Sequence, residues 1–203
     1  TAAQINAFGA DYLAALDETR LSALAASQIA GLTATNLSAL TETQVASLSA
    51  TQIQGVSTAN IRALSTTDFG ELTATQLVQL TAGQVGALST TNLFGLSATQ
   101  FGTLAATQIT GLTATQVSAL DAIRFESFTA TQIGALPGAQ IGLLSTTLIG
   151  ALTTTQVTAF AATQIPKLNV TQVRQVLSTF AAALRDRIEA IEYTDAVCST
   201  AWG

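Results

Sequence analysis

The sequence predicts an all-α solenoid, a stack of short helical turns with one turn in each eight-residue repeat. Three observations predict it. Apolar residues recur at every eighth position from Phe8 to Leu168, and a second apolar series runs in the same register from Ile5 to Val173. Ser or Thr mostly follows the first series, with Gln or Asn three residues later. A strict short period indicates equivalent modules that bury their apolar faces jointly.

Residues 112–119, Leu-Thr-Ala-Thr-Gln-Val-Ser-Ala, form a typical octad, in which we number Leu112 as position 1 and Gln116 as position 5. Ser or Thr followed three residues later by Gln is the capping box, in which each side chain bonds the other residue's backbone amide. The apolar residues at positions 1 and 6 then form the hydrophobic staple that accompanies such a helix start. Each octad is therefore expected to begin a short helix.

Glycine and proline predict where each helical turn ends. Ten of the 14 glycines stand at position 7 or 8. Because glycine readily adopts the left-handed conformation that closes many helices, these glycines are expected to end the turns. Pro166 stands at position 7, where it disfavours a continuing helix. Each octad should hold about one and a half turns of α- or 3₁₀-helix, followed by a bend.

The same octad bears on two other folds, a continuous helix and a β-solenoid. A continuous helix is excluded, because eight residues overshoot two full turns by about 80° and the apolar stripe would spiral around every face. A β-solenoid stays open as the alternative, because Thr, Ile and Val favour strands. Strand alternation places positions 1 and 6 on opposite faces. A corner within each octad would bring them together again.

The repeat is expected to form a solenoid over residues 1–172. It is followed by an amphipathic helix over residues 173–193, which should cap the last layer of the solenoid or, as the alternative, dock onto another subunit. Residues 194–203 form a tail without a readable motif. The helix is predicted by the three-and-four spacing of Val173, Val176, Leu177, Phe180, Leu184, Ile188 and Ile191.

Composition argues against several classes of function. Only 9% of the residues are charged, and the seven basic residues are mostly far apart, whereas nucleic-acid binding needs clustered basic side chains. No apolar run approaches the length of a membrane span. Histidine is absent, which excludes Ser-His-Asp and Cys-His nucleophiles. The neighbouring carboxylates Asp68 and Glu71 are expected to cap or solvate a helical turn. We therefore expect no enzyme, no cofactor and no metal.

A few departures from the octad mark candidate contact residues. Asp121, Arg124 and Glu126 bring charge into the repeat, and Phe94 adds an apolar group at position 7. These four residues are the candidate protein-contact patch. Cys198 is the only cysteine, so no intramolecular disulfide can form, and it is a candidate link to another chain.

Units of the form Leu-Thr-Ala-Thr-Gln followed by an aliphatic residue, together with Leu-Ser-Thr-Thr-Asn-Leu, resemble Thr/Gln/Leu-rich tandem tracts of large secreted or surface-exposed bacterial proteins. The resemblance covers roughly residues 1–176. It implies an extracellular or cell-surface location and a structural or adhesive role. The first hypothesis is thus a non-catalytic repeat protein that self-associates end to end. The alternatives are a protein-binding scaffold and an ice- or crystal-binding protein that uses rows of threonines.

Overall fold

A computed structural model describes residues 1–183 and residue 185. Its described residues form helices, turns and bends but no strand, so the all-α solenoid is confirmed and the β-solenoid alternative is wrong. Residues 170–183 are helical as well. The helices that precede them are α1 (Ala2–Ala14), α2 (Glu18–Ser22), α3 (Ala26–Ala30), α4 (Ala34–Leu37), α5 (Glu42–Ser47), α6 (Ala50–Gly55), α7 (Thr58–Ala63), α8 (Thr66–Gly70), α9 (Ala74–Leu77), α10 (Ala82–Ala87), α11 (Thr90–Gly95), α12 (Ala98–Gly102), α13 (Ala106–Ile109), α14 (Ala114–Ser118), α15 (Ala122–Glu126), α16 (Ala130–Ala135), α17 (Gly138–Ile141), α18 (Thr146–Gly150), α19 (Thr154–Thr158) and the 3₁₀-helix η1 (Ile165–Lys167).

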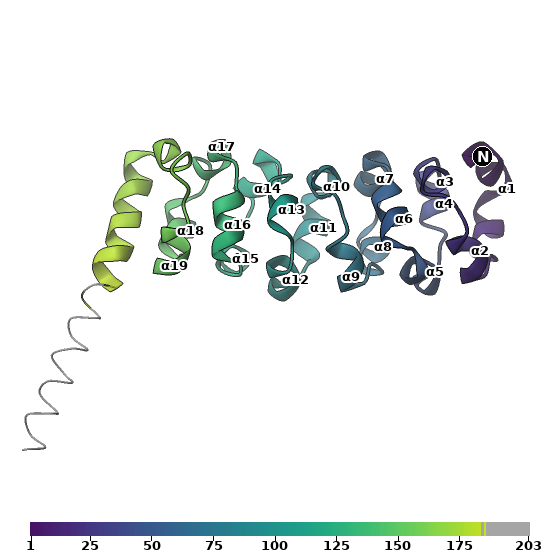
Figure 1. The fold of residues 1–203 in the computed structure, drawn as a ribbon, viewed down its shortest axis with the longest axis horizontal. Helices are drawn as coiled ribbons and strands as arrows, with labels where there is room; N and C mark the ends of the chain where they lie inside the picture. The colour runs from purple at the N-terminus through teal and green to yellow at the C-terminus, as the bar shows by residue number, and fades with distance from the viewer. Residues whose placement is uncertain (184, 186–203) are drawn as a thin grey trace, which may run out of the picture. The chain divides into compact units, whose positions relative to one another are not determined.

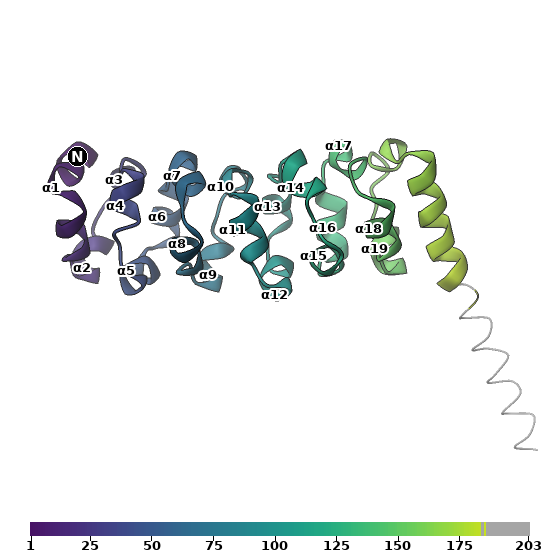
Figure 2. The ribbon, with the colours of Figure 1, turned by 180° about the vertical axis from the view of Figure 1, so that it is seen from behind.

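The chain divides into two compact units, residues 1–120 and residues 121–203. Within the first unit most helices pack on the helix three further along the chain, as α1 does on α4, α3 on α6 and α7 on α10. Figures 1 and 2 show α7 and α10 as neighbours from both sides. In the second unit α15 packs on α18 and α16 on α19 by the same rule.

Local capping explains why such short segments are helical. In α10 the Thr81 hydroxyl accepts the Gln84 amide hydrogen at 3.2 Å, and the Gln84 side-chain Oε1 accepts the Thr81 amide hydrogen at 2.8 Å. The same reciprocal pair opens α5, α6, α9, α12, α14, α16 and α19, which confirms the predicted capping box. Asp17 and Asp121 take the place of Ser or Thr and also cap their helices.

The staple residues form the core of each unit. Position 1 and position 6 are both buried in most octads, as in Leu112 and Val117, which are 2% and 0% exposed. The two series therefore point the same way, which a helical turn allows and a straight strand does not. Leu64 and Leu72, on either side of α8, are only half-buried.

The glycines at the ends of the turns have a different role from the predicted one. Among the described residues only Gly9 has a positive φ, 78°, at a kink inside α1, so the prediction of left-handed closures is wrong. Several of these glycines lie instead where two successive turns of the solenoid, which we call coils, touch each other. A Cβ at Gly111 would lie 2.0 Å from the Ala82 carbonyl oxygen, and one at Gly86 would lie 2.4 Å from the Gly111 oxygen. Glycine is needed here because the neighbouring backbone leaves no room for a side chain.

The end of the predicted capping helix, through residue 193, lies outside the described residues, as do the tail 194–203 and Cys198. Within the described part, Val173, Leu177 and Phe180 are exposed, at 36%, 60% and 39%. Whether this helix caps the solenoid or docks onto another subunit stays a prediction.

We predict that Gly111→Ala destabilises the protein by about 1–3 kcal/mol, because the new methyl group overlaps the Ala82 carbonyl and the coils must move apart. Gly70→Ala is the matched control, since a Cβ there meets no atom within 4 Å. It should be neutral or stabilising by up to about 1 kcal/mol. Denaturant unfolding midpoints measure both, and equal midpoints for the two variants would contradict the close-contact explanation.

Candidate functional site

The position-5 amides connect successive coils. The buried Gln84 side chain donates from Nε2 to the carbonyl oxygens of Ile53, at 2.7 Å, and of Val56, at 2.8 Å. We call this set of bonds the amide ladder. Its members donate to carbonyls 28 to 31 residues earlier, so that one coil holds between three and four octads. They are Gln44, Gln52, Asn60, Gln76, Gln84, Asn92, Gln108 and Gln116 in the first unit and Gln156, Gln164 and Gln172 in the second.

Glutamine fits this position better than asparagine. Gln84 uses its oxygen to cap its own helix and its nitrogen to hold the previous coil. Asn60 is one methylene shorter; it donates to the Leu32 carbonyl at 2.8 Å, and its helix lacks the reciprocal capping bond. Each glutamine of the ladder therefore satisfies the hydrogen-bonding capacity of both its side-chain oxygen and its side-chain nitrogen, as a buried amide requires.

The ladder is interrupted on both sides of α8. Asp68 replaces the amide with a carboxylate, which cannot donate to a carbonyl, and it accepts bonds from the Ser38 hydroxyl at 2.8 Å and the Ser65 amide at 3.1 Å. One coil later, Gln100 is half-buried and caps its own helix, but its Nε2 has no acceptor among the described residues. The ladder therefore links α8 to neither adjoining coil.

The core beside Gln100 is also unusual in its side chains. Phe69 and Phe101 occupy position 6 at an interval of 32 residues, and both are buried. Most other position-6 residues are the smaller Leu, Ile or Val.

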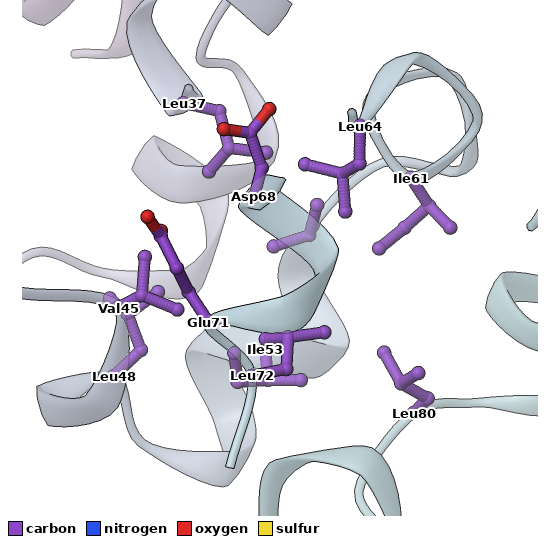
Figure 3. A pocket seen from close by; sticks show the side chains of 11 residues that line it. Leu37, Val45, Leu48, Ile53, Ile61, Leu64, Asp68, Glu71, Leu72 and Leu80 are labelled. Carbon is purple, nitrogen blue, oxygen red and sulfur yellow. The ribbon is translucent and has the colours of Figure 1, made fainter. Parts of the chain in front are cut away.

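A small pocket of about 30 Å³ lies beside α8 and is lined mainly by leucine, isoleucine and valine. Figure 3 shows Asp68 and Glu71 projecting from α8 on the side of Leu37 and Val45, with Leu80 across the pocket. The capping role expected for Asp68 is confirmed by its bond from the Ser65 amide.

The two carboxylates differ in electrostatics. Burial raises the pKa of Asp68, but the hydrogen bonds from Ser38 and Ser65 outweigh burial and leave this pKa lowered. Burial also raises the pKa of Glu71, and repulsion from Asp68 and Glu42 raises it further. Glu71 is therefore a group that the folded chain disfavours in its charged form.

The four residues of the predicted contact patch fall in different units. Phe94 lies in α11 of the first unit and is half-buried, whereas Asp121, Arg124 and Glu126 belong to the start and body of α15 in the second. Asp121 caps α15 by accepting the Arg124 amide at 2.8 Å, and it pairs with the Arg124 guanidinium. Asp121 and Arg124 are thus brought together by the fold. The protein-binding scaffold proposed around this patch stays a prediction.

Threonine rows remain on the surface. The position-2 hydroxyls accept helix-start amides, as Thr33, Thr41 and Ser49 do. The threonines at position 4 from residue 19 to residue 171 are all exposed. Ice or crystal binding would thus depend mainly on position 4, and it stays a prediction.

Known proteins provide no assignment for this site. No protein-family model, no curated protein and no solved structure matches the chain. Among the described residues, no helix has both the length and the apolar character needed to cross a membrane. A functional proposal must therefore be based on the surfaces and contacts of the molecule itself.

Gln84→Glu is predicted to destabilise the protein by about 3–5 kcal/mol, because a buried carboxylate would face two carbonyl oxygens. Gln54→Glu, at an exposed position of α6, is the matched control and should change stability by less than about 0.5 kcal/mol. Urea unfolding monitored by circular dichroism compares them. Similar losses in both variants would argue that general charge, and not the ladder, causes the effect.

Glu71→Gln should stabilise the protein at pH 7. A carboxyl whose pKa is raised by folding costs stability once the pH exceeds its folded pKa, and costs nothing well below its ordinary value of 4.5. The gain in melting temperature should therefore shrink as the pH falls through the raised folded pKa toward 4.5, and it should be lost well below 4.5. Glu126→Gln, on the exposed surface of α15, controls for the loss of one negative charge. A gain that stays constant with pH would refute the electrostatic cause.

Proposed function

We propose that this chain is a non-catalytic structural repeat module that self-associates end to end. The repeat uses its polar groups for its own construction: position 2 caps helices, and position 5 caps helices and joins coils. The absence of histidine from the sequence is in keeping with a non-catalytic role. The observation that carries the proposal is the exposed, stacked aromatic pair of Phe8 and Tyr12 at the first coil, which lines a cleft.

The first coil has the features of a face that accepts another coil. Gln28 caps its helix by accepting the Ala25 amide at 2.8 Å, but its Nε2 has no acceptor among the described residues. Phe8 and Tyr12 stack with ring centroids 4.5 Å apart and are 59% and 47% exposed. They line a cleft of about 180 Å³ together with Leu16 and Leu24. Exposed aromatic groups of this kind are typical anchors of protein interfaces.

The second unit offers the opposite chemistry. The carbonyls of Leu152 and Leu168, which correspond to ladder acceptors, receive no hydrogen bond from the described residues. A cleft of about 300 Å³ is lined by Leu168 and by the exposed side chains of Ile165 and Leu177. One face therefore provides an aromatic pair and the amide donor of Gln28, and the other provides an apolar cleft and carbonyl acceptors. Two unlike faces on one chain form a heterologous contact, which can repeat from copy to copy.

The proposed partner is a second copy of this chain, and the proposed location is the cell surface or the extracellular space. The location is supported by the resemblance to Thr/Gln/Leu-rich bacterial repeat tracts. The low charge of the chain, 9%, is also compatible with close contact between copies, since few charged groups would have to lose water.

Sedimentation velocity over a wide range of protein concentrations tests self-association. The wild-type chain should form larger species as its concentration rises. Phe8→Ser combined with Tyr12→Ser should weaken association at least about tenfold, because the anchor residues of the face are lost. Ile123→Ser, which removes a 70% exposed apolar side chain from α15, is the control and should leave association unchanged. A wild-type chain that remains monomeric at every concentration would overturn the proposal.

A further inference from the structure

A second cleft, of about 240 Å³, lies between α8, α11 and α12. Its inner wall is formed by the buried side chains of Phe69, Leu77 and Leu96. Gly70 and Gly95 lie at its exposed rim, and a Cβ at either glycine would meet no atom within 4 Å. This open space agrees with the cleft and distinguishes these two glycines from those pressed between coils.

The cleft coincides with the missing bond of the amide ladder. Gln100 lines it, and so does Leu72, whose carbonyl is the acceptor that the ladder would use. Neither the Gln100 Nε2 nor the Leu72 carbonyl has a hydrogen-bond partner among the described residues. An open donor and an open acceptor thus border one cleft, next to an aromatic wall.

We propose that this cleft binds a small, uncharged primary carboxamide with an aromatic or branched apolar body. The carboxamide carries both functions that are missing here: its N–H₂ donates to the Leu72 carbonyl and its oxygen accepts from the Gln100 Nε2. The carboxamide of the ligand takes the place that a glutamine side-chain amide fills where the ladder joins two coils. The apolar body lies against Phe69, Leu77 and Leu96.

The size of the cleft and the uncharged character of its lining restrict the class of ligand further. A cavity of about 150 Å³ holds benzene, so the present cleft accommodates a substituted ring. No ionisable side chain lines the cleft. A charged ligand would lose water without gaining a counter-charge, whereas a neutral amide exchanges one set of hydrogen bonds for another. The ligand is therefore neutral.

Titration of the ¹⁵N-labelled chain with benzamide, followed by NMR, tests the proposal. Benzamide at up to about 10 mM should shift the backbone signals of Phe69, Leu96 and Gln100, as expected for an affinity near 1 mM. Benzoate has the same shape with a negative charge and should bind at least about tenfold more weakly. Absence of benzamide-induced shifts, or shifts confined to other parts of the chain, would overturn the proposal.

Substitutions at the cleft identify the contacts. Gly95→Leu and, from the opposite rim, Gly70→Leu should each abolish binding by filling the cleft, with circular dichroism verifying that the chain is folded. Gln100→Leu should weaken benzamide at least about fivefold while leaving toluene binding unchanged, because only the amide contact is lost. Gln54→Leu, on the exposed surface, is the matched control. Benzamide binding that survives all three cleft substitutions would refute the site whether or not the chain self-associates.

Discussion

The hydrogen bond from a buried glutamine amide to the backbone of the previous coil is the interaction on which this structure depends. Helices of four to six residues have no stability of their own, because nucleation costs more than so few bonds return. The staple residues supply non-directional burial, but they do not specify which backbone atoms meet. The amide does so, since it must satisfy its donors when it is buried. Register between coils is thus specified at position 5.

The need of a buried amide for hydrogen-bond partners explains why small changes at position 5 have local consequences. Asparagine keeps one coil contact and loses the return to its own helix. Aspartate keeps that return and contacts the previous coil only by accepting from the Ser38 hydroxyl, so it cannot donate to the backbone there. Both clefts beside α8 lie where the ladder is interrupted: Asp68 lines one, and Phe69 and Gln100 line the other. In a repeat structure each layer contacts only its neighbours, so such a defect remains confined to its layer.

The regular layers also leave little chemistry on the surface. Position-2 hydroxyls and position-5 amides are used in construction, which leaves the position-4 threonines and few charges outside. The surfaces that we propose for binding lie at the first coil, at the apolar cleft of the second unit and beside α8. The proposed carboxamide site depends on the open ladder groups of Gln100 and Leu72.

Local features were readable from the sequence because they involve residues only a few positions apart. The capping box between Thr81 and Gln84 and the joint burial of positions 1 and 6 are of this kind. The role of the glycines was predicted wrongly, because Gly111 is needed where the Ala82 carbonyl of another coil leaves no room for a side chain. Coil length, the ladder acceptors and the gap at Gln100 were decided only by tertiary structure. They depend on contacts between residues 28 to 31 positions apart, which no eight-residue pattern encodes.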